Sequence, residues 1–216
     1  MTAASRESGG APKEASIAQR RSASVRQDQL VEIAIRFFAK KGYAGTSLRE
    51  IADEARITKA ALYYHFPTKE ALYDRIVVNS MKALLESVTD AVNTASNGEE
   101  KVRRFMLASA DFMDSSRDAW KASSHVFWSG EEAGPRNAAI DLRDGYERLL
   151  RQCIRAANDE GKFRNVDPSM AGRMLLSLLN QISRWHSLSG RLSTHEVINQ
   201  YLDFALNGLR VHPVAE

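Results

Sequence analysis

Apolar side chains recur every three or four residues along most of the chain, which is the spacing of one face of an α-helix. The first such run starts at Val25 and ends at residues 40–42, where two lysines and a glycine are typical of a helix C-terminus. No segment alternates apolar and polar residues for long, and no hairpin signal separates alternating segments. The pattern therefore predicts an all-α fold of about nine helices.

Capping residues and helix breakers set the expected bounds of these helices. Ser47 and Glu50 have the spacing of a capping box ahead of a short helix, and Thr58 is a suitable N-cap for another helix, from 59 to about 65. Ser193 and Glu196 form a second capping box ahead of the last helix. The other helices are expected at about 68–93, 99–115, 118–128, 135–160 and 168–188.

Residues 1–24 contain Ala, Ser, Gly and charged residues, with almost no large apolar ones. This composition cannot bury enough surface to offset the entropy of ordering, so we expect a disordered basic tail. The tail is either an arm that touches DNA phosphates or a solvated leader without a role. Its charged residues are Arg6, Glu7, Lys13, Glu14, Arg20 and Arg21.

Composition and charge narrow the class of protein. The chain has 216 residues, 26% of them charged, as in a globular protein of one or two domains. It has no secretory leader and no apolar run long enough to span a bilayer, so we expect a cytoplasmic protein. Its single cysteine, Cys153, excludes an intramolecular disulfide. The first 80 residues carry a net charge of +4 and the rest −1, which favours a polyanionic partner for the N-terminal third.

The two short predicted helices, joined by a tight turn, fit a helix-turn-helix. A helix of residues 59–65 is too short to be stable alone, so we expect Leu62 and Phe66 to pack against its neighbours. Its other face offers hydroxyls, a cation, a methyl group and an imidazole but no carboxylate, which suits a groove flanked by phosphates. This outer face consists of Thr58, Lys59, Ala60, Tyr63, Tyr64 and His65.

Three motifs over about residues 27–75 closely resemble the signature of the tetracycline-repressor (TetR) family. They are Gly42-Tyr43, the run Thr46-Ser-Leu-Arg-Glu-Ile-Ala52, and the run from Thr58 through Tyr63-Tyr-His-Phe-Pro-Thr-Lys69 to Leu72. The resemblance implies a helix-turn-helix DNA-binding domain at 25–70 and a helical ligand-binding and dimerisation domain at 71–212. It also implies a double-stranded DNA operator and a small-molecule effector as partners.

The resemblance implies a role for each matching residue. Ser47 would meet a phosphate, Thr58, Lys59 and Ala60 would reach bases, and Lys69 would contact a phosphate. The aromatic run Tyr63, Tyr64 and His65 would contact the DNA backbone. The residues that look structural are Leu48, Ile51, Ala52, Leu62 and Phe66.

Two positions depart from the family pattern. Arg56 occupies a turn position that is often glycine, so it either carries backbone strain or indicates a turn built differently. Ala60 also stands where many members have glycine. A side chain at this position changes which base fits, so the operators of relatives cannot be assumed for this chain.

The helix expected at 168–188 is apolar over more than one face. With the last helix, it is the candidate for the four-helix interface of a homodimer, as the resemblance also implies. The alternative is a central helix buried within a monomer.

Large apolar residues between 100 and 186 form either an ordinary core or, as the family suggests, a pocket for an apolar ligand. Arg184 beside Trp185 resembles the branch of the family that senses acyl-CoA thioesters, for which Arg184 would be a buried cation needing a partner. The alternative is an intersubunit ion pair for Arg184 and core packing for Trp185. The candidate ligand residues are Phe105, Met106, Phe112, Met113, Trp120, Phe127, Trp128, Tyr146, Met174, Gln181, Arg184 and Trp185, with Asn180 and His186 as further polar groups in this helix.

No catalytic constellation is present. The five histidines lack the H-E-x-x-H spacing, and neither a G-x-S-x-G elbow nor a phosphate-binding loop occurs. No motif predicts a cofactor or a metal. The sequence therefore favours a dimeric repressor that is released by an apolar or acyl-CoA-type ligand. The alternatives are a multidrug-type sensor of hydrophobic cations that controls an efflux gene, and a helical protein without DNA binding.

Overall fold

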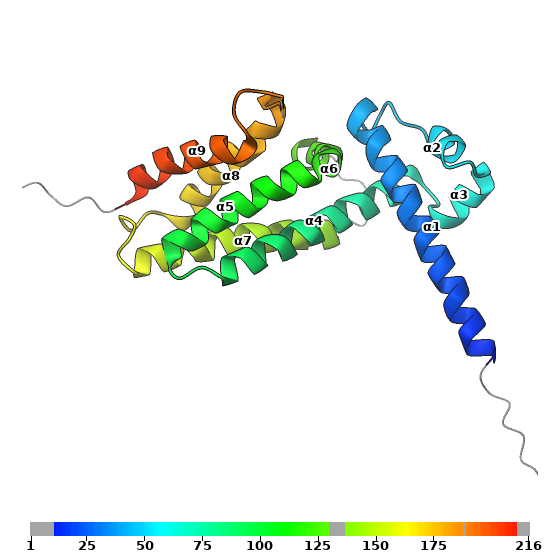
Figure 1. Cartoon of the computed structure of the whole chain (residues 1–216), viewed down its shortest axis with the longest axis horizontal. Coiled ribbons are helices and arrows are strands. Elements are labelled where there is room, and N and C mark those ends of the chain that lie inside the picture. The colour runs from blue at the N-terminus through cyan, green and yellow to red at the C-terminus, as the bar shows by residue number, and fades with distance from the viewer. Residues whose placement is uncertain (1–10, 130–136, 188, 211–216) are drawn as a thin grey trace, which may run out of the picture. The chain divides into compact units, whose positions relative to one another are not determined.

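The computed structural model describes the backbone of residues 11–129, 137–187 and 189–210 and the side chains of residues 25–123, 138–187 and 189–210. This described part contains nine α-helices and no strand, so the predicted all-α class is confirmed (Figure 1). The helices are α1 Ala11–Lys41, α2 Leu48–Glu54, α3 Lys59–His65, α4 Lys69–Asn93, α5 Gly98–Ser115, α6 Arg117–Ser129, α7 Asn137–Asp159, α8 Pro168–Trp185 and α9 Thr194–Leu209.

The predicted caps account for the helix starts. Both capping boxes are formed, at Ser47 with Glu50 ahead of α2 and at Ser193 with Glu196 ahead of α9. The Thr58 hydroxyl accepts from the Ala61 N–H at 3.2 Å ahead of α3. These side chains satisfy backbone N–H groups that have no partner within the helix.

Helix α1 begins at Ala11, whereas a disordered tail was expected up to residue 24. The backbone of residues 11–24 continues the helix instead, and residues 1–10 lie outside the described part of the chain. The expectation rested on the lack of apolar surface. Once a helix is nucleated in a packed segment, however, it propagates through good helix formers without burying anything. The Ala, Gln and Arg residues of this segment are such formers.

The chain divides into two compact units, residues 1–73 and 74–216, with α4 belonging in part to each. In the first unit, α1, α2 and α3 pack together, and the residues expected to be structural are buried. Tyr43 and Tyr73 close this core with Phe38, because their rings meet in edge and stacked contacts at 4.9–5.8 Å.

The turn after α2 is made by a left-handed residue. Arg56 has φ 53°, its N–H donates to Asp53 O, and the Ile57 N–H donates to Ala52 O at 3.0 Å. Paired bonds of this kind define a Schellman motif, whose left-handed position is usually glycine. The strain expected at Arg56 is therefore present.

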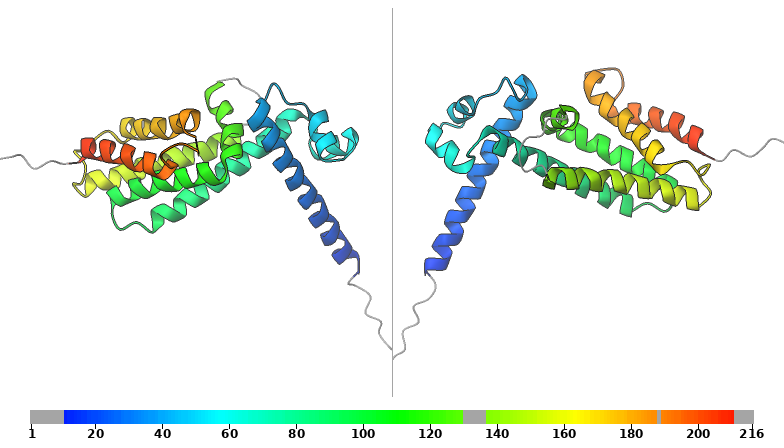
Figure 2. Two further views of the ribbon diagram at one scale, coloured as in Figure 1. Left: turned by 45° about the horizontal axis from the view of Figure 1, so that its top comes forward. Right: turned by 180° about the vertical axis from the view of Figure 1, so that it is seen from behind.

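In the second unit, α5 packs against α6, α7, α8 and α9, and the views of Figures 1 and 2 show it beside α7 and α9. Its start lies very close to α7, since a Cβ at Gly98 would stand 2.2 Å from the Ala157 backbone nitrogen. The Glu160 carboxylate accepts from the Gly98 N–H at 2.9 Å. Cys153 is buried, and burial raises the pKa of its thiol to about 11, which makes it unreactive.

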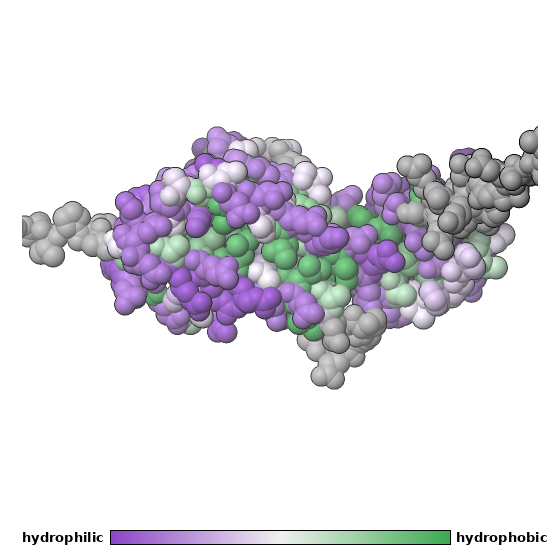
Figure 3. Space-filling view, turned by 90° about the horizontal axis from the view of Figure 1, so that it is seen from below, coloured by the Kyte–Doolittle hydropathy of each residue, from purple (hydrophilic) through white to green (hydrophobic). Residues whose placement is uncertain are grey.

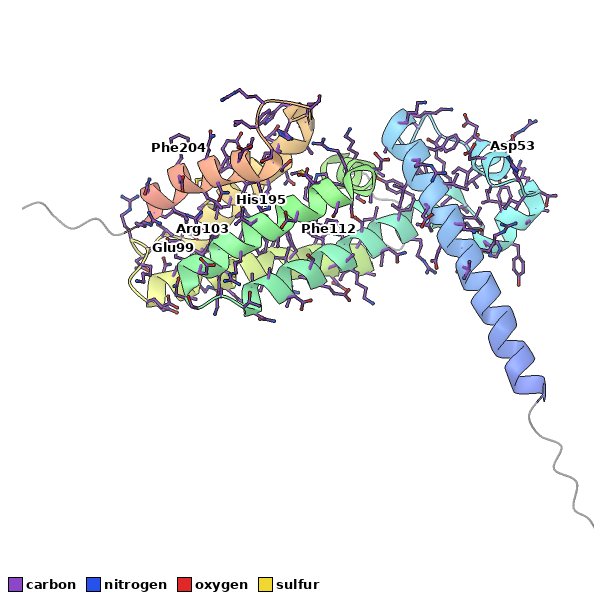
Figure 4. All side chains as sticks on the ribbon, in the orientation of Figure 1. Asp53, Glu99, Arg103, Phe112, His195 and Phe204 are labelled. Atoms are coloured by element: carbon purple, nitrogen blue, oxygen red, sulfur yellow. The ribbon has the colours of Figure 1, made fainter. Side chains whose placement is uncertain are left out.

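Charged pairs join α5 to the α9 region along one side of this unit (Figure 4). Arg210 donates to Glu99 at 2.6 and 3.0 Å, Arg103 lies 3.6 Å from Asp203, and His195 is bonded to Asp111.

Among the described residues, none of the helices has the length and apolar character needed to cross a membrane.

Candidate nucleic-acid interface and ligand cavity

The outward face of α3 carries the predicted DNA-contacting residues. Leu62 is fully buried and holds the helix to the first unit, while Thr58, Lys59 and Ala60 are exposed. Tyr64 is 84% exposed and Tyr63 is 40% exposed. The Tyr64 ring is therefore free of the core of this unit and available to a partner.

The side chains of this face support one another without a carboxylate. The Lys59 ammonium lies 5.4 Å from the centre of the Tyr63 ring, within the range of a cation–π contact. The Tyr64 and His65 rings meet edge to face at 5.3 Å, and His65 is half-buried. The face therefore presents one cation and two phenols, which are donors suited to phosphate oxygens and base edges.

Lys69 at the start of α4 is held in position by its neighbours. Its ammonium lies 4.2 Å from the centre of the Tyr43 ring, and the Tyr43 hydroxyl donates to Glu70 at 2.6 Å. Partial burial lowers the pKa of Lys69, and the charge of Glu70 opposes that shift. A cation that is partly stripped of water and fixed on a ring is oriented before it meets a phosphate.

Ser47 is exposed, but its hydroxyl already has partners. It donates to Glu50 at 2.9 Å and accepts from the Glu50 N–H at 3.3 Å. The Lys41 ammonium lies 2.5 Å from the same carboxylate, and this contact, followed by the bonds from Ser47, lowers the pKa of Glu50 to about 2. A phosphate at this helix start would thus find the Ser47 hydroxyl engaged in the cap.

A cavity of about 250 Å³ lies among α4, α6, α7 and α8 of the second unit. Its apolar wall consists of Met81, Leu84, Trp120 and Leu176. Its polar groups are Ser80, Ser123, Arg143, Tyr146, Glu147 and Asn180. Figure 3 shows a hydrophobic area bordered by hydrophilic residues on one side of this unit. A concave, largely apolar space with a few polar groups is the usual form of a small-molecule site.

Two of the polar cavity groups already have partners. The Tyr146 hydroxyl lies 2.7 Å from Ser109 Oγ, which itself donates to the Phe105 carbonyl, so the phenol is the donor. Burial raises the pKa of Tyr146, and the phenol therefore stays neutral. Ser123 donates to the Ala119 carbonyl at 2.7 Å. Arg143 donates to Asp144 at 3.1 Å but has further donors, so it remains a candidate contact for a ligand together with Glu147, Asn180 and Ser80.

The structure separates the predicted ligand residues into groups. Trp120 and Tyr146 line the cavity, as does Asn180. Phe105, Met106 and Met113 are fully buried in the core, and Phe112 is half-buried; none of the four lines the cavity. The side chains of Phe127 and Trp128 lie outside the described residues.

Arg184 is exposed in the single chain, so the buried cation expected in α8 is not formed within one protomer, and an intersubunit ion pair stays a prediction. Gln181, Arg184, Trp185 and Met174 are exposed and do not line the cavity. These residues lie on the face of α8 that the chain's own core does not cover, where polar and apolar side chains are mixed. Sequence periodicity finds the apolar faces of a helix but does not say which face meets its own domain.

Arg143 and Glu147 are cavity residues that the sequence pattern did not single out. They stand four residues apart on α7, a spacing that places both on one helix face with Tyr146. The only sequence signal was a charged pair beside a predicted pocket tyrosine. Such pairs are common on solvated helix faces, so the pattern alone does not distinguish the two cases.

The uncovered faces of α8 and α9 carry most of the exposed large apolar side chains of the second unit. Met170 and Met174 lie one turn apart on α8, and Trp185 ends that helix. Phe204 on α9 is 79% exposed and is labelled in Figure 4.

No cluster of three or more His, Cys, Asp or Glu side chains that could hold a metal occurs within the described residues.

Comparisons with known proteins agree with this architecture. The family model described as "Bacterial regulatory proteins, tetR family" matches residues 30–76. A second model, "Tetracyclin repressor-like, C-terminal domain", matches residues 95–209. The first match covers the unit with the helix-turn-helix, and the second covers most of the unit with the cavity.

Relatives of similar length cover almost the whole chain. The "HTH-type transcriptional repressor KstR2" of Mycobacterium tuberculosis is 27% identical over 190 residues, 85% of this chain and 92% of the relative. The structure of PfmR from Thermus thermophilus is 34% identical, with a TM-score of 0.75 over 84% of this chain and 99% of that one. The structure of AibR with isovaleryl coenzyme A and operator DNA is 26% identical, with a TM-score of 0.77 over 83% and 97%. The chain belongs to the TetR family and is a DNA-binding transcriptional repressor, not an enzyme.

Proposed function

We propose that the chain is a ligand-responsive repressor whose operator is released by an acyl-CoA-type effector bound in the cavity of the second unit. The observation that carries this proposal is the cavity itself, which is lined by the apolar side chains of Met81, Leu84, Trp120 and Leu176 and by polar side chains. The relative AibR has been crystallised with isovaleryl coenzyme A and operator DNA together. An apolar wall beside polar groups suits a molecule with an acyl end and a polar arm.

In this proposal, Thr58, Lys59 and Ala60 reach base edges, while Tyr63, Tyr64, His65 and Lys69 contact the DNA backbone. Their support is the exposure of the α3 face and the fixed position of Lys69 over Tyr43. The Ser47 cap places the N-terminus of α2 at the surface, where its remaining N–H groups can meet a phosphate.

The functional unit is a homodimer formed through α8 and α9. Its support is the exposure of Met170, Met174, Trp185 and Phe204 on these helices. Exposed apolar surface on one part of a protein usually marks an interface. A dimer also doubles the contacts with a two-fold symmetric operator.

A thermal-shift panel tests the effector class. Isovaleryl-CoA and longer acyl-CoAs are compared with the free acids, with CoA alone and with hydrophobic cations. Because binding to the folded state raises the melting temperature, we expect a rise with acyl-CoAs only. A rise with the free acids or with CoA alone to the same extent would contradict an acyl-thioester effector.

Operator release is tested by measuring whether the effector and the operator weaken each other's binding equally. If the effector weakens operator binding by some factor, the operator must weaken effector binding by the same factor. The operator fragment is first selected from random duplexes, and effector affinity is then measured with and without it. Equal effector affinity in both conditions would rule out release by this ligand.

A second candidate is a sensor of hydrophobic cations. It is favoured by one observation, the Glu147 carboxylate in a cavity that also has the aromatic side chains of Trp120 and Tyr146. In the thermal-shift panel, a rise with hydrophobic cations alone would select this function over the first.

A further inference from the structure

The charged groups of the cavity are not paired with each other. Arg143 and Glu147 lie one turn apart on α7, yet no ion pair joins them in the described structure. Arg143 Nη2 instead donates to Asp144 at 3.1 Å. Its Nε is buried and has no hydrogen-bond partner within the described residues. This atom has almost no accessible surface, so the donors that Arg143 offers to a ligand in the cavity are those of its Nη groups.

The charge around Arg143 argues against an anionic ligand group at this place. Asp144 already offsets the guanidinium charge, and Glu147 adds a second carboxylate to the same wall. A carboxylate or phosphate bound at the Arg143 guanidinium would therefore meet repulsion from Glu147. A neutral acceptor would not.

A neutral amide satisfies both side chains. Its carbonyl oxygen accepts from Arg143, and its N–H donates to the Glu147 carboxylate, which can only accept when ionised. Asn180, on the cavity wall from α8, adds a donor and an acceptor. The apolar wall leaves space for a hydrocarbon, but the volume of about 250 Å³ lies below the roughly 300 Å³ at which pockets for drug-sized molecules begin.

We infer that the cavity binds its thioester ligand through a neutral amide of the pantetheine arm, held between Arg143 and Glu147, with a short acyl group against Met81, Leu84 and Trp120. This inference rests on the proposed function, which names only the acyl-CoA class. It adds that Arg143 does not bind the phosphates of CoA and that the cavity excludes long acyl chains.

The test is isothermal titration of the full-length protein with four probes of one acyl group. The first is isovaleryl-CoA, and the second is the isovaleryl thioester of N-acetylcysteamine, which keeps an amide but no phosphate. The third is S-butyl isovaleryl thioester, which has neither group, and the fourth is isovalerate. Palmitoyl-CoA tests the limit on chain length. We expect binding of the first two probes and much weaker binding of the other three.

Two variants test the amide site: Arg143→Met, which keeps the length of the side chain, and Glu147→Leu. Arg148→Met is the matched control, because Arg148 is an exposed arginine on the same helix. We expect Arg143→Met and Glu147→Leu each to weaken the CoA and N-acetylcysteamine thioesters alike by about tenfold or more, since each removes a hydrogen bond to a charged group. The control should leave both affinities unchanged. Arg143→Lys retains the charge without the planar guanidinium and should also weaken the binding of both thioesters.

The outcomes separate this inference from the proposed function. If isovaleryl-CoA binds but Arg143→Met weakens it no more than the control does, the amide site is overturned and the acyl-CoA effector stands. If Arg143→Met weakens the binding of the CoA thioester only, Arg143 binds a phosphate and the inference is likewise overturned. If no thioester binds to the wild type, both fail. Unchanged melting temperature and operator affinity without ligand show that each variant is folded.

Discussion

At the scale of single residues, the DNA-binding unit has one position with a strained backbone and one lysine that its neighbours hold in place. Arg56 takes a left-handed conformation that L-residues with a Cβ adopt at a cost of about 1 kcal/mol. Lys69 is held over Tyr43 at 4.2 Å and is partly removed from water. The first feature weakens the fold slightly, whereas the second holds the cation of the proposed phosphate contact in a fixed position.

Replacing Arg56 by glycine should stabilise the protein by about 0.5–1 kcal/mol, because glycine adopts the left-handed conformation without a steric penalty. Chemical denaturation followed by circular dichroism measures the change. Asn165→Gly is the matched control, since Asn165 has φ 54° and asparagine tolerates this region far better than arginine. A gain at Asn165 equal to that at Arg56 would show that backbone strain is not the cause.

Lys69→Ala should weaken operator binding and reduce the slope of log affinity against log salt by about one unit, as expected for one lost phosphate contact. Fluorescence anisotropy at several salt concentrations measures both quantities. Lys82→Ala, an exposed lysine on the same helix, is the control and should change neither. An unaltered salt slope for Lys69→Ala would remove Lys69 from the DNA interface.

At the scale of elements, short helices depend on their caps. Helix α2 starts in a capping box whose carboxylate, on Glu50, also binds Lys41 at 2.5 Å. The pKa of Glu50 is about 2 in the folded chain, against 4.5 for the free side chain. A depressed pKa stabilises the folded state above pH 4.5, and this contribution is lost as the pH falls toward 2.

Glu50→Gln should therefore destabilise the protein at neutral pH, and the difference from the wild type should shrink between pH 4.5 and pH 2. Glutamine still fits a capping box, so the pH-dependent part of the difference reports the charge and its bond to Lys41. Denaturation curves at several pH values measure it. A difference that stays constant with pH would assign the effect to the cap alone.

The elements also show what the sequence could and could not predict. Caps and breakers located α2, α3 and α9, because a cap is a local interaction between residues close in sequence. The α3 face was predictable for the same reason, since one turn of helix fixes which residues lie opposite Leu62. The cavity was not, because its lining comes from four helices whose packing depends on distant residues. Arg143 was therefore missed, and Arg184 was placed inside although it is exposed.

At the scale of the whole molecule, the exposed apolar side chains of α8 and α9 form the proposed dimer interface. Phe204→Asp should convert a dimer to a monomer, because it places a charge in the centre of the proposed interface. Sedimentation velocity measures the mass. Ile140→Asp, at an exposed apolar residue of α7, is the control and should leave the dimer intact. A wild-type protein that sediments as a monomer, or a Phe204→Asp protein that remains a dimer, would contradict this interface.

The exposed side chains of Met170, Met174, Trp185 and Phe204 also bear on how steeply repression responds to the amount of protein in the cell. When only the paired chain fits an operator, and pairs are scarce, operator occupancy rises with the square of the chain concentration. Halving the protein then lowers occupancy about fourfold by this mass-action relation. Dilution by cell growth without new synthesis of the protein would thus relieve repression even with no effector present.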